Sequence, residues 1–222
     1  MKSFDEKTLV QKLEKILIKK FFTDVSFREF SAGYGIADLV FAPDFSFKKN
    51  TISRAPLTDF NILSMLISLE VNKEYSLGEL HKQFNYLQPS KLNKSISFLI
   101  KNKYLYKADK KYYIKTVEEG TINPIKKIIA IEAKLSDHRN GLIQARRYQY
   151  FADESYLAIL KKAERNINMD EFNKYNIGLI LFNDKTGNIE IRNPQNYNNI
   201  FKYNVSFFAK ELMLNQFINP AF

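Results

Sequence analysis

The sequence has no cysteine, which excludes disulfide bonds and thiolate metal sites. It has no stretch of about 18 apolar residues and no basic leader followed by an apolar segment, so we expect neither a membrane span nor export, and by default a cytoplasmic location. Other absences are a glycine-rich phosphate loop, a Ser-His-Asp order, a His/Cys cluster and any internal repeat. These absences leave carboxylate and lysine side chains as the candidates for a functional site.

The composition allows a globular protein with a sizeable core. At 222 residues and 45% apolar content, the chain is long enough for one large domain or a domain carrying an insertion. Its formal net charge of +10, with 13 tyrosines and 19 phenylalanines, is compatible with a polyanionic partner such as nucleic acid. Lysine enrichment from an AT-rich genome would give the same total, so the distribution of the charge has to decide between the two.

Residues 128–134 are apolar, mostly β-branched, and end in a carboxylate and an amine. Such a run, closed by polar residues, predicts a strand buried on both faces. Residues two apart on a strand point the same way, so Glu132 and Lys134 are expected side by side at its end. Charge is costly there unless a metal or a counter-charge receives it. The alternative is a strand that runs out into solvent.

A second buried carboxylate is predicted at Asp38. Residues 24–30 alternate as in a half-buried strand, which puts Glu29 on the face of the other odd-numbered residues. After a glycine-containing turn, residues 36–42 form an apolar strand with Asp38 inside it. If this hairpin pairs with the following core strand, Asp38 and Glu132 lie on adjacent strands within a few ångströms of each other.

Periodicity predicts the remaining elements of an α/β (α+β) fold, a mixed central sheet flanked by helices. Residues 5–21 form an amphipathic helix whose terminal charges match its macrodipole. Glu14 lies close to the apolar stripe of this helix, where the solvent border is favoured over a neighbouring active site. Further elements are helices at 141–153, 169–175 and 205–217, strands at 155–160 and 177–182, and an edge hairpin that ends at 189–192.

The stretch between the Asp38 strand and the Glu132 strand is too long to be a loop. It contains predicted helices at 58–70, 76–84 and 89–102, followed by two short aromatic strands within 104–114. The middle helix begins with a Ser76–Glu79 capping box. Three helices and a hairpin resemble a winged helix-turn-helix, in which the third helix enters a DNA groove and the hairpin wing touches the backbone.

Positive charge is concentrated in residues 89–115, which hold eight lysines against the single acid Asp109, a segment charge of +7. A genome-wide lysine bias does not concentrate charge on one predicted helix and wing. Contact with phosphates is therefore favoured over a merely solvated face. The predicted contacts are Lys91, Lys94, Lys101, Lys107, Lys110 and Lys111.

The order of elements resembles the PD-(D/E)xK nuclease superfamily over residues 5–160, once the insertion is removed. Gly35-Ile36-Ala37-Asp38 looks like the metal-binding aspartate of that superfamily, and Glu132-Ala133-Lys134 is similar to its E-x-K. Gln144 and Tyr148, four apart on one helix face, are similar to the Q-x-x-x-Y helix of the RecB-type branch. No proline precedes Asp38, a departure that leaves the activity open.

The resemblance implies a DNA endonuclease that depends on Mg²⁺ or Mn²⁺. Asp38, Glu132 and the carbonyl of Ala133 would supply the hard oxygen ligands that such an ion accepts. Lys134 would orient or deprotonate the attacking water, or stabilise charge on the phosphate. The residues do not decide between these roles.

The resemblance also gives roles to the helix that follows. Gln144 would hold Lys134 or the scissile phosphate, and Arg147 and Tyr148 would contact the nucleic-acid backbone. Core packing is an equal alternative for Tyr148. His138, beside the site, is favoured as a solvated loop residue, and His81 as a structural one.

The implied organisation is a restriction-endonuclease-like core at 1–56 and 119–222, with a winged helix inserted at 57–118. The implied partner is DNA, double-stranded in the first instance, with no membrane contact, and a homodimer stays open. An alternative from another class is a catalytically inactive DNA-binding protein or regulator that keeps the nuclease fold.

Overall fold

The computed structural model describes residues 4–43, 45, 54–108, 112–116, 123–195 and 203–220. The chain forms two compact units. The first unit comprises Met1–Phe47 and Ile125–Lys210, and the second comprises Lys48–Pro124 and Glu211–Phe222. The segment 57–118 lies within the second unit, and so do residues 211–222, which the sequence assigned to the core. In the described part of the chain, no helix is long and apolar enough to cross a membrane.

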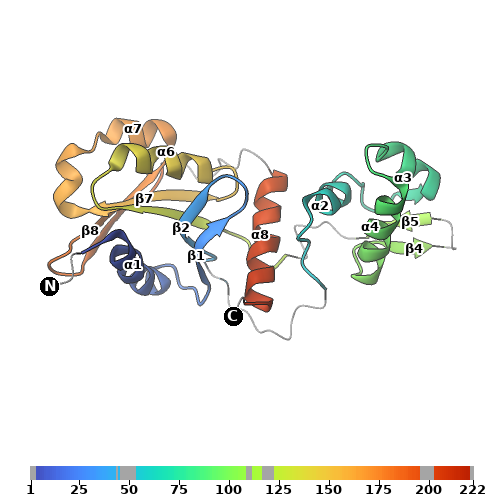
Figure 1. Ribbon diagram of the computed structural model, residues 1–222, viewed down its shortest axis with the longest axis horizontal. Coiled ribbons are helices and arrows are strands. Elements are labelled where there is room, and N and C mark those ends of the chain that lie inside the picture. The colour runs from blue at the N-terminus through green and yellow to red at the C-terminus, as the bar shows by residue number, and fades with distance from the viewer. Residues whose placement is uncertain are drawn as a thin grey trace. The chain divides into compact units, whose positions relative to one another are not determined.

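The first unit is built on a six-stranded mixed sheet in the order β1-β2-β6-β7-β8-β9 (Figure 1). The strands are β1 (Ser26–Ser31), β2 (Ile36–Phe41), β6 (Ile129–Lys134), β7 (Glu154–Leu160), β8 (Gly178–Phe182) and β9 (Ile189–Arg192). β1, β2 and β6 pair antiparallel, β6, β7 and β8 pair parallel, and β9 closes the edge antiparallel to β8. β7 and β8 are buried along their whole length, as continuous apolar runs predict.

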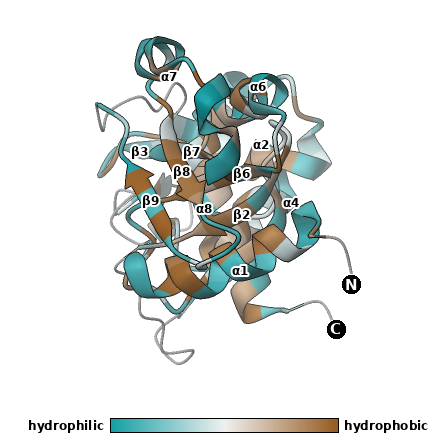
Figure 2. Ribbon diagram, turned by 90° about the vertical axis from the view of Figure 1, so that its left-hand side faces the viewer, coloured by the Kyte–Doolittle hydropathy of each residue, from teal (hydrophilic) through white to brown (hydrophobic). Residues whose placement is uncertain are grey.

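Helices cover both faces of this sheet. α1 (Glu6–Lys20) lies on one face, and α6 (His138–Tyr148) and α7 (Met169–Tyr175) lie on the other (Figure 1). Leu9, Leu13 and Leu17 of α1 pack on one apolar cluster of strand residues, while Leu142 and Ala145 of α6 pack on another. Figure 2 colours β6, β7 and β8 mostly as hydrophobic and α6 and α7 mostly as hydrophilic, while α1 carries residues of both kinds. The predicted mixed central sheet flanked by helices is confirmed.

Between residues 54 and 116, the described part of the second unit forms three helices and a three-stranded antiparallel sheet in the order β3-β5-β4. Its elements are α2 (Phe60–Ile67), β3 (Glu74–Ser76), α3 (Leu77–Gln83), α4 (Pro89–Lys101), β4 (Tyr106–Ala108) and β5 (Tyr112–Ile114). The predicted capping box is present, because Ser76 and Glu79 bond to each other's backbone amides at the start of α3. Strand β3 has no counterpart among the predicted elements.

Lys115 is one of the eight lysines of the basic segment, but the structure removes it from those that could contact a phosphate. It is buried, and its Nζ donates hydrogen bonds to the carbonyls of Leu66 and Leu69, at 3.3 and 3.0 Å. These carbonyls belong to the C-terminal end of α2 and the residues after it, where an amine satisfies acceptors that the helix leaves open. Lys115 therefore stabilises α2 and is not exposed to a phosphate.

A buried carboxylate ties together distant segments of the second unit. α8 (Tyr203–Ile218) contributes Tyr203–Lys210 to the first unit and its remaining residues to the second. Glu211 is fully buried and accepts hydrogen bonds from both terminal nitrogens of Arg54, at 2.8 and 2.9 Å. It also accepts from the Leu57 amide at 2.7 Å and the Asn123 side chain at 2.8 Å. Residues 54–57, residue 123 and α8 are thus held by one side chain.

We expect Glu211→Ala to lower the free energy of unfolding by about 3–5 kcal/mol, because it removes the carboxylate that compensates the buried Arg54 guanidinium. The exposed Glu190, which forms ion pairs with Lys161 and Arg192, provides the matched control. Glu190→Ala should cost less than about 1 kcal/mol. Urea denaturation followed by circular dichroism measures both, and equal losses in the two variants would contradict the structural role of Glu211.

Candidate functional site

The centre of the sheet brings the two predicted carboxylates together. The β2–β6 ladder pairs Val40 with Ala130 and Leu39 with Ile131, and the next step of this register is Asp38 with Glu132. The strands are already separating there, because Asp38 Oδ2 accepts a hydrogen bond from the Ala133 amide at 2.7 Å. The sequence-based placement of Asp38 beside Glu132 agrees with this geometry.

Glu132 is 1% exposed and is held by two side chains. Its Oε1 lies 2.7 Å from Lys134 Nζ, and its Oε2 contacts the Tyr148 hydroxyl. That hydroxyl also lies 2.7 Å from the carbonyl oxygen of Ile36, and its single proton serves one of the two acceptors at a time. Burial raises the pKa of Glu132, an effect that the bonds from Lys134 and Tyr148 oppose and the charge of Asp38 reinforces.

Asp38 and Lys134 show the same competition between burial and charge. Burial raises the pKa of Asp38, while the Ala133 amide and the charge of Lys134 act to lower it. For Lys134, burial works to lower the pKa, but its hydrogen bond and ion pair with Glu132 outweigh this, and the pKa is raised overall.

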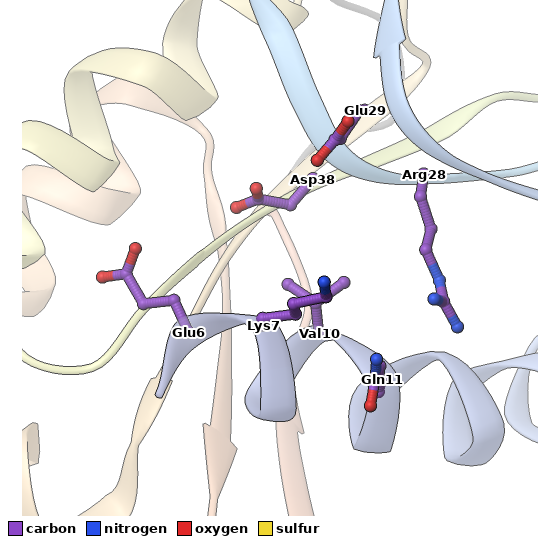
Figure 3. A pocket seen from close by; sticks show the side chains of 7 residues that line it. All are labelled: Glu6, Lys7, Val10, Gln11, Arg28, Glu29 and Asp38. Atoms are coloured by element: carbon purple, nitrogen blue, oxygen red, sulfur yellow. The ribbon is translucent and has the colours of Figure 1, made fainter. Parts of the chain in front are cut away.

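A pocket of about 390 Å³ opens beside Asp38, between α1 and the β1–β2 hairpin (Figure 3). Its lining residues are Glu6, Lys7, Val10 and Gln11 from α1, Arg28 and Glu29 from β1, and Asp38 from β2. Glu6 reaches toward the site: its carboxylate lies 3.9 Å from Lys134 Nζ and accepts from the Leu135 amide at 3.4 Å. Sequence reasoning missed Glu6, since an acid in the first turn of a helix is explained by the macrodipole alone.

Glu29, a further acid near the pocket, differs from expectation. It has a φ of 50°, a left-handed conformation inside β1, and the ladder pairs on either side of it skip the Glu29–Asp38 position. The predicted alternation of β1 therefore fails at Glu29, which lines the pocket with Asp38.

Glu14 lies at the solvent border, as favoured. It is half-buried and binds Arg28 Nε and Ser26 Oγ, both at 2.8 Å.

The other predicted site residues of this unit lie on α6, and their surroundings differ. Tyr148 is 1% exposed and bonded to Glu132, so it positions that carboxylate and is too buried to reach a nucleic-acid backbone. Gln144 is half-buried, and its amide makes no hydrogen bond to any residue that the structure describes, Lys134 included. Arg147 is exposed, as a backbone contact requires. His138 is the first residue of α6 and partly exposed.

The predicted phosphate contacts of the second unit fall into two groups. Lys91, Lys94, Lys101 and Lys107 are exposed. Lys110 and Lys111 lie outside the described residues. His81, predicted to be structural, lies on α3 with its ring nitrogen 3.3 Å from Asn93 Oδ1 on α4.

The site has the donor set for a divalent cation held by few protein ligands. Within the described ranges, no group of three or more His, Cys, Asp or Glu side chains is arranged to hold a metal. Mg²⁺, however, is commonly bound through one or two carboxylates together with waters and substrate phosphates. Asp38 and Glu132 meet that requirement. Burial raises the pKa of both carboxyls, and the charge of Asp38 raises that of Glu132 further, so a cation between them would favour their ionised forms.

Comparison with known proteins adds no relative. No protein-family model matches the chain, and no curated protein and no solved structure matches it. Inference about function therefore starts from the geometry of Asp38, Glu132 and Lys134.

We expect Asp38→Asn to be more stable than the parent at about pH 8, with a difference that shrinks toward about pH 4. The folded pKa of Asp38 is raised above its ordinary value of 3.8, so the folded state binds the proton more readily than the unfolded state. The parent consequently loses stability as the pH rises from the ordinary value through the raised one, whereas asparagine carries no such charge. Melting temperatures across this pH range measure the effect.

A variant equal to the parent or less stable than it at high pH would show that Asp38 is already fully compensated in the folded protein. Adding Mn²⁺ at high pH provides a second comparison. An ion that binds the folded state raises the melting temperature of the parent, and it should raise that of Asp38→Asn less.

Proposed function

We propose that the first unit is the core of a metal-dependent nuclease of the PD-(D/E)xK type. The observation that carries the proposal is the pairing of Lys134 with Glu132 at 2.7 Å, directly beside Asp38 on the neighbouring strand. Three charged groups at the buried centre of a sheet reduce stability. Such a cost is typical of sites kept for function.

The order of elements supports a restriction-endonuclease-like fold. Helix α1 is followed by strands β1, β2 and β6, then by helix α6 and strand β7, with residues 48–124 of the second unit inserted between β2 and β6. This is the helix, three strands, helix and strand of the superfamily. Asp38, Glu132 and Lys134 lie on the strands that the resemblance requires.

The chemistry follows from the residue types. A bound Mg²⁺ or Mn²⁺ would activate water and neutralise charge on the phosphate oxygens. Asp38, Glu132 and the Ala133 carbonyl are the oxygens that would hold it. Lys134 Nζ, paired with Glu132, would orient or deprotonate the attacking water or stabilise charge on the phosphate. The hydroxyl of Tyr148 holds Glu132 in place by donating a hydrogen bond to its Oε2.

The second unit resembles a winged helix-turn-helix and would bind DNA. α4 corresponds to the third helix, and the β4–β5 hairpin to the wing. Of the exposed lysines of α4, Lys94 and Lys101 lie on the side of the helix away from its buried residues Leu92, Ile96 and Leu99, and Lys91 lies at the flank of the buried face. This arrangement supports contact with a phosphate backbone.

A catalytically inactive DNA-binding protein or regulator is the second candidate. One observation favours it: Ala37, not proline, precedes Asp38, and both oxygens of Glu132 already have protein partners. Calorimetric titration with Mn²⁺ separates the two candidates. A working site binds the ion through Asp38, so Asp38→Asn should remove the heat of binding, whereas an inactive site gives none in either protein.

We expect the purified chain to cleave nucleic acid in the presence of Mg²⁺ or Mn²⁺ but not with EDTA. Lys134→Ala should reduce the single-turnover rate by about 10²–10³-fold, as the loss of one charge-stabilising donor does. Affinity for the substrate should change by less than about twofold, because the amine acts on the chemical step. Lys185→Ala is the matched control, since Lys185 is exposed in the turn between β8 and β9 of the same unit.

The substrate panel should contain plasmid, linear duplex, single-stranded DNA and RNA. Absence of metal-dependent cleavage on all of them would overturn the nuclease proposal. A variant Lys134→Ala that cuts as fast as the parent would remove Lys134 from the chemistry.

Binding by the second unit should be separable from cutting. The double variant Lys94→Ala, Lys101→Ala should flatten the dependence of log affinity on log salt by about 0.9 for each phosphate that is no longer neutralised. Cleavage at saturating DNA and low salt should stay close to that of the parent, because the carboxylates are untouched. Anisotropy titrations at several salt concentrations measure the slope, and an unchanged slope would assign the lysines another role.

A further inference from the structure

The outer face of α6 carries an unusual set of exposed side chains. Arg139, Ile143, Arg146 and Arg147 are all exposed, and at 3.6 residues per turn they share an arc of about 100°. The opposite face is buried and consists of Gly141, Leu142, Ala145 and Tyr148. The helix contains no acidic residue, and Asp137 at its N-cap is bonded to Asn140. We call the four exposed residues the α6 stripe.

The arginines of the α6 stripe have no ion pair with any described residue, a property that they share with Arg165 but not with the remaining arginines. Arg28 pairs with Glu14, Arg54 with Glu211, and Arg192 with Glu164. Arg146 instead places its guanidinium 3.7 Å from the ring centroid of Tyr175. The three guanidinium groups lie on one helix face, and no described carboxylate pairs with them. Guanidinium binds phosphate in a bidentate manner, so this face is suited to phosphates.

A stacked pair of tyrosines lies next to this stripe. Tyr150 follows the end of α6, and its ring stacks on that of Tyr34 with centroids 4.5 Å apart and planes 9° apart. Both side chains are half-buried. A pocket of about 330 Å³ joins Tyr150 to the stripe and is lined by Ile143, Arg146, Arg147 and Gln149.

The tyrosine pair is also tied to the candidate site. Tyr34 belongs to the turn between β1 and β2, where Gly35 adopts a φ of 103°. A Cβ on Gly35 would lie 3.3 Å from the Tyr148 ring, so this turn packs closely against α6. The next residue, Ile36, is 61% exposed, and its carbonyl meets the hydroxyl of Tyr148, which itself holds Glu132. The stacked rings and the buried carboxylate are thus joined through one tyrosine.

From these observations we propose that the α6 stripe and the Tyr34–Tyr150 pair bind a single strand of nucleic acid, with an unpaired base stacked on the tyrosines. The inference rests on the proposed nuclease function, and it names unpaired strands as the form of substrate that the first unit holds. Arginine contacts to phosphates combined with aromatic stacking of bases is the usual chemistry of single-strand binding.

The dimensions of the stripe fit a strand. Arg139 and Arg147 are eight residues apart on a helix that rises 1.5 Å per residue, so they are separated by about 12 Å along its axis. A stacked strand rises about 3.4 Å per nucleotide, so the two guanidinium groups span about three to four nucleotides. An acidic peptide would also satisfy the arginines, but it would leave the stacked rings and the exposed Ile143 without matching groups.

The test measures binding without cleavage. The full chain is titrated in EDTA against a fluorescent single-stranded DNA of about 12 nucleotides and against the blunt duplex of the same sequence. Tyr34→Leu should weaken single-strand binding by at least about fivefold, the equivalent of losing one stacked base, while Tyr34→Phe, which keeps the ring, should bind like the parent. The duplex should be little affected, because its bases are not free to stack.

The arginines provide an independent variant that leaves the hairpin turn intact. Arg139→Gln, Arg147→Gln should flatten the salt dependence of single-strand binding by about 0.7 for each phosphate that is no longer neutralised. Arg165→Gln, which changes an exposed arginine in the short 3-10 helix η2 (Lys161–Asn166) after β7, is the matched control and should change nothing. Melting temperatures confirm that each variant is folded.

Equal losses for single strand and duplex would overturn base stacking, and no loss for either DNA would overturn the surface altogether. Binding to an acidic peptide that the arginine variants abolish, with no effect on DNA, would replace the proposal. Since none of these measurements needs metal or cleavage, they stand whether or not the nuclease test succeeds.

Discussion

The antiparallel pairing of β2 with β6 is the contact on which the first unit depends. It joins the N-terminal hairpin to the parallel half of the sheet, and its register brings Asp38 to Glu132. Two carboxylates at the buried centre of a sheet repel each other and lose hydration. The Ala133 amide, the Lys134 amine and the Tyr148 hydroxyl offset part of that cost. These three groups therefore compensate a carboxylate pair that the register of the two strands creates.

Much of this arrangement can be predicted from sequence because it depends on short-range pattern. Apolar runs with a single acid inside them identify β2 and β6, and the spacing of Leu9, Leu13 and Leu17 identifies α1. The closeness of Asp38 to Glu132 follows once these two strands are neighbours. These features depend on local sequence pattern or on the pairing of one strand with another, and the structure agrees with them.

Other features depend on long-range packing that no local pattern reveals. Glu6 has an ordinary place in the first turn of a helix, and only the packing of α1 on the sheet takes it toward Lys134. In the sequence, Lys115 resembles any surface lysine, yet its amine is buried and donates hydrogen bonds to carbonyls at the end of α2. The left-handed backbone of Glu29 inside β1 contradicts its residue type, since glutamate has no preference for that conformation. In the first two cases, a polar group is satisfied by a distant backbone or charge.

The position of the second unit in the chain has a consequence for synthesis. β2 and β6 are adjacent in the sheet, but residues 48–124, the larger segment of the second unit, are synthesised between them. A ribosome releases the chain from its N-terminus, so the β1–β2 hairpin emerges long before its neighbour exists. Until β6 arrives, the inner edge of β2 presents unpaired amides and carbonyls, a ready template for pairing with another chain. The nascent hairpin is thus the segment most in need of shielding, by the ribosome surface or a chaperone, and the carboxylate pair cannot assemble until most of the second unit has been translated.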